Sequence, residues 1–542
     1  MLRSALPLTL ALTACAAGRP AVQHAAPPTP ATYRGVVRYE ARHPTPHGAS
    51  QDLERRPARF VEVVAEADDH RPLARTVTDA EGRFSLDAPA PATELAVYAH
   101  VLHDGGDLRV SGEADGVSTH ALRVPRPDAS HPLDLVAADA TPGGIAGAFH
   151  IVDTALRGFD ATRAWTGVTL PPLMVYWGRG VTTEWSYYRG ERPVRSGRFC
   201  LELLGGGPGQ QRSTDTDEHD EGIILHEFGH FVFDRLSSNS STGGSHPGGF
   251  LIDPGLAWEE GRATWFSSAV RRDPHYRDTI GLEPGGSMRV DDDLERTPSG
   301  PRGIGSELTV SSVLWDLIDG RDGWDDEDHD GVAVDPAVVL RAMMAAHDDP
   351  AAYPALGTFL RQVSSGSAPV VTREALLAML RATGEPATEH GANAVLPADD
   401  DGDWPSTLAV PGSAGGKIDG LSNPAPSGGG ARPQNGLDAL RVYRVQMPGR
   451  GWLGLELLIE GSGQPGDHTD IDLELRDHRG ELVAASRGTG PRETLSRLVD
   501  AGYHYVYVRD AGTGNRASYT LRTRGRVLPA EPATVAPAAR TR

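Results

Sequence analysis

Cysteine is almost absent from this chain, since Cys15 and Cys200 are the two that occur among 542 residues. So few cysteines exclude a fold held together by many disulfides, and the length is ample for separate hydrophobic cores instead. Basic charge is also scarce, because 52 Lys and Arg face 73 Asp and Glu and leave a formal net charge of −21. This charge argues against nucleic acids and anionic membrane surfaces as binding partners.

Long apolar runs are missing as well, apart from one near the N-terminus. Residues 5–14 are mostly apolar and are interrupted by Pro7. The run is too short to span a bilayer and is typical of a secretory signal. It ends in Leu12-Thr13-Ala14-Cys15, which resembles a bacterial lipobox. The resemblance implies that residues 1–15 are a lipoprotein signal peptide and that Cys15 is lipidated.

This signal predicts where the protein is found. Ala16, rather than an aspartate, follows Cys15. By resemblance to bacterial lipoproteins, we therefore expect a protein of the bacterial cell envelope, held in the outer membrane by its lipid anchor. An ordinary cleaved signal peptide, and hence a secreted protein, is the alternative.

The most informative motif is His226-Glu227-Phe228-Gly229-His230. Two histidines four residues apart on a helix lie on one face and can share a metal ion. Glu227 between them can reach a metal-bound water as a general base. The amphipathic pattern predicts one helix over residues 215–235, with acidic residues at its start, where the helix dipole favours negative charge. The alternative interpretation is a core helix that carries two surface histidines.

A zinc ion bound by two histidines needs a third protein ligand and a fourth position open to water. A second helix is predicted over residues 256–266. Glu260 shares a face of this helix with small residues, so that face can lie close against the first helix. Glu259 shares its face with bulkier side chains and is the fallback ligand. Without the histidines upstream, this acidic pair would be interpreted as a solvated partner of the helix dipole.

Together, the two motifs resemble the gluzincin zinc metallopeptidases, which include thermolysin, fungalysin and the zinc aminopeptidases. The resemblance implies that His226, His230 and Glu260 bind Zn²⁺ and that Glu227 is the catalytic base. Two departures stand out. The gap from His230 to Glu260 is 30 residues, longer than the usual thermolysin arrangement. Thr264 stands where thermolysin-like enzymes carry an aspartate that orients a ligand histidine, so we expect the orienting residue elsewhere.

Zinc peptidases also use a side chain that donates to the developing oxyanion. His246 lies in the polar insertion between the two motifs and could fold over the metal. Tyr276 and His275 are further candidates. The alternative for His246 is a solvated histidine in a glycine-rich loop.

A second metal site is suggested by Asp326, Asp328 and Asp330, which are followed by Gly331 as at the start of a calcium loop. Oxygen ligands at alternate positions before a glycine turn suit Ca²⁺. The twelfth position is Ala337 and not the bidentate glutamate of an EF-hand. A calcium site and a solvated acidic loop are therefore both open interpretations.

The remaining segments differ in composition. Strand patterns follow the signal, and a Thr78-Asp79-x-x-Gly82-x-Phe84 turn among them resembles the carboxypeptidase regulatory-like β-sandwich. Strands near the C-terminus resemble the bacterial pre-peptidase C-terminal domain, also a β-sandwich. The expected divisions are a tether at 16–31, the first sandwich at 32–140, a zincin-like catalytic region at 144–396, a linker at 397–434, the second sandwich at 435–526 and a disordered tail at 527–542.

The sequence thus predicts a multidomain protein with an N-terminal β-sandwich, a central α+β zincin-like domain and a C-terminal β-sandwich. The expected function is hydrolysis of peptide bonds in a peptide or protein substrate by an exported zinc metallopeptidase. One alternative is a non-catalytic surface lipoprotein that uses the zincin-like fold for binding or scaffolding, although such a protein has no need of Glu227. Another is a zinc hydrolase that acts on other substrates, which the peptidase-like flanking regions disfavour.

Overall fold

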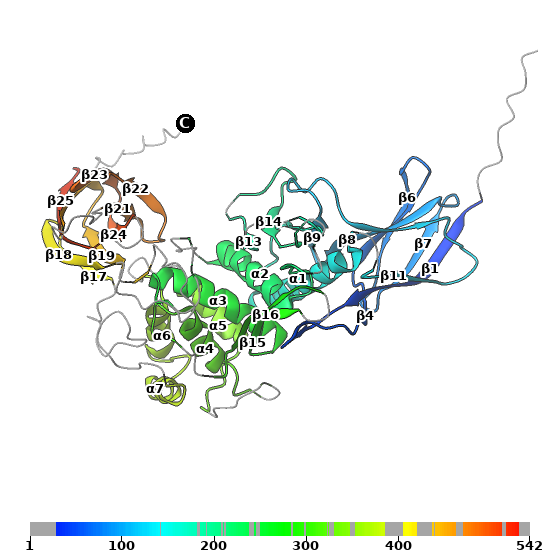
Figure 1. Ribbon diagram of the computed structural model, residues 1–542, viewed down its shortest axis with the longest axis horizontal. Helices are drawn as coiled ribbons and strands as arrows, with labels where there is room; N and C mark the ends of the chain where they lie inside the picture. Colours follow the sequence, from blue (N-terminus) through cyan, green and yellow to red (C-terminus); the bar gives the residue numbers. More distant parts are fainter. Residues whose placement is uncertain are drawn as a thin grey trace, which may run out of the picture.

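The computed structural model describes residues 29–529 apart from 141–142, 182–184, 191, 208–209, 211–212, 238–242, 245, 247–249, 283–285, 297–299, 322–323, 325–329, 347–352, 385–404, 420–435, 438, 462–469 and 512–515. The expected signal with Cys15 lies outside the described residues, as do residues 16–28 of the tether and 530–542 of the tail. The molecule is elongated, with strands at both ends and helices between them (Figure 1).

Two sheets form the N-terminal region. In the first, β1 (Ala31–Ala41) pairs in parallel with β11 (Leu133–Ala137) and antiparallel with β4 (Glu54–Pro57) and β7 (Arg83–Ala88). The second contains β5 (Val61–Glu66), β6 (Pro72–Val77), β8 (Glu94–His103), β9 (Gly106–Ser111) and β10 (Ala121–Pro125). A short hairpin, β2 (Pro44–Thr45) and β3 (Gly48–Ala49), follows β1. Alternate residues of the strands point inward, so both sheets contribute to one core.

The turn between β6 and β7 carries the chain from the second sheet to the first. Gly82 has a φ of +75°, and a Cβ there would lie 2.3 Å from the carbonyl oxygen of Val37. Only glycine suits this position. The Thr78-Asp79-x-x-Gly82-x-Phe84 turn joins β6 of the second sheet to β7 of the first, so it does not connect two paired strands of one hairpin.

The second sheet continues across the expected boundary between residues 140 and 144. Past that boundary, β12 (Leu173–Tyr176) pairs in parallel with β9, and β14 (Phe199–Glu202) and β13 (Tyr187–Tyr188) follow it. The order of the described strands is β13-β14-β12-β9-β8-β5-β6, with β10 beside β8. The strands of the second N-terminal sheet and the strands that precede the histidine motif are thus parts of one mixed sheet.

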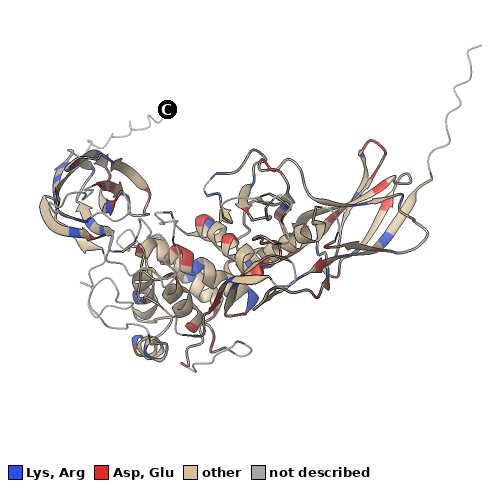
Figure 2. Ribbon diagram, viewed as in Figure 1, with Lys and Arg blue, Asp and Glu red and all other residues tan. Residues whose placement is uncertain are grey.

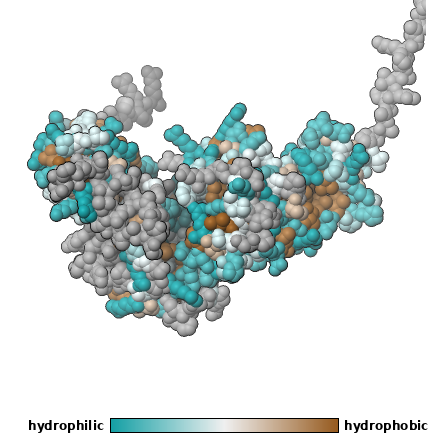
Figure 3. All heavy atoms as spheres, in the orientation of Figure 1, coloured by the Kyte–Doolittle hydropathy of each residue, from teal (hydrophilic) through white to brown (hydrophobic). Residues whose placement is uncertain are grey.

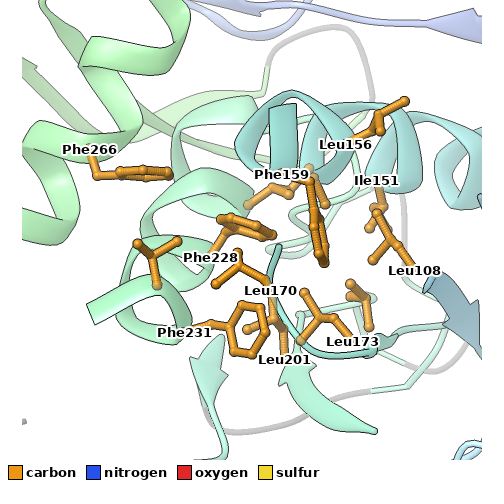
Figure 4. Close-up of a cluster of buried hydrophobic side chains, with 14 of the residues drawn as sticks. Leu108, Ile151, Leu156, Phe159, Leu170, Leu173, Leu201, Phe228, Phe231 and Phe266 are labelled. Atoms are coloured by element: carbon orange, nitrogen blue, oxygen red, sulfur yellow. The ribbon is translucent and has the colours of Figure 1, made fainter. Parts of the chain in front are cut away.

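Helix α1 (Ile145–Thr166) packs on this sheet and links it to the helices. Figure 4 shows Phe159 of α1 between the sheet residues Leu108 and Leu173 and the ring of Phe228. The ring centroids of Phe159 and Phe228 are 5.2 Å apart in an edge-to-face arrangement. One contiguous core therefore extends from the N-terminal strands into the helical region.

The helical region holds α2 (Glu221–Leu236), α3 (Pro254–Arg271), α4 (Glu307–Asp316), α5 (Pro336–Ala346), α6 (Leu356–Ser364), α7 (Arg373–Ala382) and the hairpin of β15 (His275–Ile280) and β16 (Ser287–Asp293). Helix α2 begins at Glu221, six residues later than the sequence pattern predicts. The acidic segment before it is a loop, because Asp215 forms a backbone bridge with Ile280 and Asp220 accepts hydrogen bonds from Thr279.

Two further sheets form the C-terminal region. One runs β17 (Ser406–Thr407), β19 (Leu440–Met447), β24 (Gly502–Asp510), β21 (Ile471–Arg476) and β22 (Leu482–Ser486), and the other β18 (Gly412–Asp419), β25 (Arg516–Val527), β20 (Gly451–Gly461) and β23 (Arg492–Val499). They enclose a hydrophobic core of their own. Strands β17 and β18 lie within residues 397–434, so part of the expected linker belongs to these sheets.

The surface is mixed in charge and polarity. Acidic and basic residues are interspersed along all three regions (Figure 2). The face seen in Figure 3 is mostly hydrophilic, with smaller hydrophobic patches over the centre and the N-terminal strands. Among the described residues, no helix combines the length and the apolarity that crossing a bilayer requires.

Candidate metal centre

Helices α2 and α3 approach each other closely because small residues face one another. A Cβ on Gly229 would lie 3.1 Å from the Cα of Ala263. A larger side chain at either position would separate the two backbones. The face of α3 that the sequence marked by its small residues is therefore the one that meets the histidine helix.

The close approach brings His226, His230 and Glu260 together. The Nε2 atoms of His226 and His230 are 3.1 Å apart, and they lie 3.2 Å and 3.1 Å from Oε2 of Glu260. His226 and Glu260 are buried and His230 is partly buried. Each residue offers one ligand atom to a common point. We call these three residues the ligand triangle.

Thr264 orients one of the histidines. Its Oγ1 lies 3.0 Å from Nδ1 of His226, on the opposite side of the ring from the triangle. When Nδ1 donates its hydrogen to this hydroxyl, Nε2 keeps its lone pair for a metal ion. The expectation that the partner of this histidine comes from elsewhere was wrong, because the hydroxyl at position 264 itself contacts Nδ1 of His226.

Glu259, the fallback ligand, points away from the triangle. Its carboxylate accepts hydrogen bonds from the guanidinium of Arg262, and both side chains are buried. The Arg262 guanidinium in turn lies over the ring of Phe233, 4.2 Å from its centroid. Of the two neighbouring glutamates, the structure brings only Glu260 to the histidines.

Glu227 lies beside the triangle and is buried, with 7% of its surface exposed. Burial raises its pKa above the ordinary value for a glutamate, and the nearby His226 and His230 offset only part of this effect. A carboxylate with a raised pKa is a stronger base. Glu227 therefore has the position and the basicity of a proton acceptor.

His246 reaches the triangle from the polar insertion. Its Nε2 lies 3.8 Å from Oε1 of Glu260, and its Nδ1 donates to Oε1 of Glu307 at 3.1 Å. Burial lowers the pKa of His246, but the carboxylates of Glu260 and Glu307 outweigh burial and raise the pKa to about 10. His246 is thus a cationic donor at the edge of the site.

Glu307 was missed from the sequence. It is the first residue of α4, and Ser306 caps this helix by accepting a hydrogen bond from the backbone N–H of Thr309. The cap was recognisable from the sequence, and a glutamate in the first turn satisfies the helix dipole. The sequence around Glu307 gives no sign that its carboxylate contacts His246, which lies 61 residues earlier in the chain.

The other two donor candidates lie on β15. The ring of Tyr276 has its centroid 5.5 Å from that of His226. Burial, with Asp278 and Glu227 nearby, raises the pKa of Tyr276 well above 10, so its phenol keeps its proton. His275 contributes its backbone carbonyl to Arg271, and no contact of its side chain with the triangle occurs among the described residues.

The suggested calcium loop is described only in part. Asp326 and Asp328 lie outside the described residues. Oδ1 of Asp330 accepts a hydrogen bond from the backbone N–H of Val332 at 2.6 Å. A site for Ca²⁺ in this loop stays a prediction.

No family model matches the sequence. An uncharacterized protein of Archaeoglobus fulgidus is 30% identical over 107 residues, which make up 18% of this chain and 28% of the relative's length. The C-terminal region structurally resembles the pre-peptidase C-terminal domain of a collagenase from Bacillus anthracis, with a TM-score of 0.16 and 14% identity over 22% of this chain and 92% of that chain. PliG of Aeromonas hydrophila, a periplasmic inhibitor of g-type lysozyme, matches 22% of this chain and 97% of its own at a TM-score of 0.14 and 9% identity. Such likenesses say nothing of the activity of this chain.

Proposed function

We propose that this chain is an exported zinc metallopeptidase with a zincin-like central region of the gluzincin type. The observation that carries the proposal is the ligand triangle with the buried carboxylate of Glu227 beside it. The N-terminal strands are proposed to be a carboxypeptidase regulatory-like domain and the C-terminal sheets a pre-peptidase C-terminal-like domain. Peptides or proteins are the proposed substrates.

The ligand triangle fits zinc in the type and the spacing of its atoms. Two imidazoles and one carboxylate are a common ligand set for catalytic zinc. Bonds of about 2.0–2.2 Å at tetrahedral angles put ligand atoms about 3.3–3.6 Å apart. The three separations of 3.1–3.2 Å are close to this value. Three protein ligands leave one position for water or substrate.

The chain's own residues supply the proton transfers. When bound, zinc supplies Lewis acidity and lowers the pKa of a coordinated water. Glu227 accepts the proton of the attacking water and delivers it to the amine that leaves. His246 and Tyr276 are the groups at the edge of the site that donate to negative charge on the carbonyl oxygen. Peptide hydrolysis needs both roles.

Glu227→Gln gives the sharpest test. The amide cannot accept a proton, so we expect kcat/KM on a diverse peptide pool to fall by about 10²–10⁴-fold while zinc stays bound. Glu260→Gln should lose zinc. Glu259→Gln is the matched control: its carboxylate faces Arg262, so the variant should melt at a lower temperature and still bind one zinc.

Two results would contradict the proposal. If zinc-loaded wild-type protein cleaves no peptide in the pool, the peptidase assignment fails and the non-catalytic binding protein takes its place. If Glu227→Gln cleaves as fast as the wild type, the catalytic base has been misassigned. Zinc content and activity, measured on the same samples, separate these cases.

The proposal includes a lipid anchor at Cys15 and a location in the cell envelope. Cys15→Ser should stay unprocessed, lack the acyl mass in mass spectrometry and leave the membrane fraction. A mature N-terminus downstream of Cys15 without lipid would mean that the protein is secreted instead.

A further inference from the structure

Three aspartates from two distant parts of the chain meet beside the start of α2. Asp215 and Asp217 belong to the loop that precedes the helix, and Asp278 belongs to β15. One carboxylate oxygen of each lies within 4.8 Å of those of the other two. None of the three belongs to the ligand triangle or contacts it.

Two of the three carboxylates are buried, that of Asp215 is partly buried, and all three are incompletely satisfied. Asp217 is 2% exposed and Asp278 is 7% exposed. In all three aspartates, Oδ1 has no hydrogen-bond partner among the described residues. A buried anionic oxygen without a partner is strongly unfavourable. A positive charge between these oxygens is therefore expected.

The neighbouring side chains supply only part of that charge. The guanidinium of Arg289 pairs with Asp215, and its Nε lies 3.7 Å from Asp278. The hydroxyl of Ser186 donates to Oδ2 of Asp217. A fourth carboxylate nearby, that of Asp220, accepts hydrogen bonds from the backbone N–H and the hydroxyl of Thr279. These neutral donors add no positive charge to the cluster. Four carboxylates, Asp220 included, against one guanidinium leave three negative charges, of which one divalent cation neutralises two.

We infer that Asp215, Asp217 and Asp278 bind one calcium ion. Calcium takes oxygen ligands at about 2.3–2.6 Å, so oxygens on opposite sides of the ion stand about 4.6–5.2 Å apart. One oxygen of each aspartate lies within 4.8 Å of those of the other two, so a single ion of this size can contact all three, and an all-carboxylate set suits calcium better than zinc. Backbone carbonyls and water complete the shell of such sites.

Protons are the competing way to relieve the repulsion. Burial raises the pKa of Asp217 well above its usual range, and the neighbouring Asp278 and Asp220 raise it further. Burial, with the charge of Asp215, raises the pKa of Asp278 to about 7. Calcium binding and proton uptake are therefore alternatives that an experiment can separate.

The ion would connect two elements that shape the metal centre. The loop of Asp215 leads directly into α2, and β15 carries Tyr276 next to His226. Calcium between the loop and β15 fixes the start of the histidine helix and the position of the tyrosine together. The inference does not depend on the proposed peptidase activity, because it is measured by calcium binding and melting temperature.

The experiment uses the full-length protein, stripped of calcium with EGTA and then titrated with CaCl₂. Wild type should bind calcium by calorimetry and melt at a higher temperature when calcium is present. Asp217→Asn should weaken this binding at least about tenfold and abolish the rise in melting temperature. Asp69→Asn is the matched control and should keep both effects, because Asp69 is exposed in the turn between β5 and β6.

The substitution itself should not unfold the protein. Asparagine has the shape of a protonated aspartate and carries no charge, so the calcium-free variant should melt no lower than the calcium-free wild type. Asp278→Asn should behave in the same way as Asp217→Asn. The inference is overturned if wild type shows no calcium effect, as shared protons would give, or if the effect survives Asp217→Asn or is lost in Asp69→Asn.

Discussion

The two β regions at the ends of the molecule are attached to the helices in different ways. The N-terminal strands continue into the sheet of the central region through the β9–β12 pair, and both regions share one core. The C-terminal sheets keep a separate core. The N-terminal strands are therefore part of the fold that builds the candidate metal centre, whereas the C-terminal sheets are an appended unit.

Buried charges strengthen the N-terminal attachment. The guanidinium of Arg42 lies 2.7 Å from Asp139, and Arg179 pairs with the same carboxylate from the central region. Arg56 of β4 lies 2.7 Å from Glu221, the first residue of α2. The N-terminal strands therefore contact the start of the histidine helix directly.

The C-terminal attachment is smaller and mainly aromatic. A small hydrophobic cluster, separate from the two larger cores, joins Tyr353 and Ala355 to the C-terminal sheets. Its other members are Leu440, Val442, Tyr505 and Tyr507. The hydroxyl groups of Tyr353 and Tyr507 are 2.7 Å apart, and Tyr353 also donates to Asp253, which caps α3. This contact lies at the start of α3, almost two turns before Glu260.

The largest effects on folding and zinc binding are expected from deleting each β region in turn. A chain that lacks residues 1–140 loses β9, one of the two strands paired with β12, and the N-terminal part of the shared core, so it should not fold and should bind no stoichiometric zinc. A chain that ends before residue 405 should keep the near-ultraviolet circular dichroism signal of a folded central region. It should also still bind one zinc. If the chain without residues 1–140 folds and binds zinc while the chain that ends before residue 405 does not, our assignment of the two β regions is reversed.

The substitution Arg42→Ala tests the buried charges. It leaves the carboxylate of Asp139 buried with fewer partners, which should lower the free energy of unfolding by about 3–5 kcal/mol. Arg55→Ala in β4 is the control, since Arg55 is 59% exposed and its pair with Glu40 should contribute less than about 1 kcal/mol. Urea denaturation of both variants measures the difference. Equal losses would mean that the burial of the Arg42–Asp139 pair does not matter.

The same pair predicts a dependence on pH. Burial alone would raise the pKa of Asp139, but His219, Arg42 and Arg179 outweigh it and hold the pKa well below its ordinary value. A carboxyl with a depressed folded-state pKa stabilises the fold above its unfolded pKa of about 3.9, and this contribution disappears as the pH falls below that value. The loss between pH 5 and pH 2, followed by urea denaturation, should be smaller in Asp139→Asn than in wild type.

The substitution Thr264→Val tests whether the hydroxyl of Thr264 orients His226 in the candidate metal centre. Without the hydroxyl, Nδ1 of His226 loses the group that sets its tautomer, so zinc affinity should fall about 10–100-fold. Thr264→Ser keeps the hydroxyl and should stay near wild type. Competition with a chromogenic chelator gives both affinities. An unchanged affinity in Thr264→Val would mean that packing alone orients the histidine.

The smallest effect is expected from Tyr507→Phe. The change removes one buried hydrogen bond to Tyr353 and should lower the free energy of unfolding by about 1 kcal/mol. Zinc content and peptide cleavage should be unchanged, because the contact lies outside the ligand triangle. A loss of zinc would show that the C-terminal sheets shape the metal centre after all.

Local patterns predicted much of the candidate site. The helical period placed His226 and His230 on one face, and the small residues beside Glu260 distinguished it from Glu259. Alternating apolar residues predicted strands in both β regions. These features depend on neighbours in the sequence, which a single chain displays.

Features made by distant partners could not be predicted in this way. The β9–β12 pair joins residues more than sixty positions apart, so the sequence placed a boundary where the structure has one sheet. The acidic residues before α2 matched a helix start, but the contacts of Asp220 with Thr279 and of Asp215 with Ile280 hold them in a loop. Likewise, only the fold brings Glu307 to His246.

The β9–β12 pair also sets the order in which the chain can fold. As the chain is made, β9 at residues 106–111 is an uncovered sheet edge until β12 at residues 173–176 has been synthesised. Helix α1 lies between them in the sequence, so this is a parallel crossover, which forms slowly because its contacts are distant. An open edge of this kind pairs readily with other chains. A cell that produces this protein therefore has to keep unfinished sheets apart until α1 and β12 have docked.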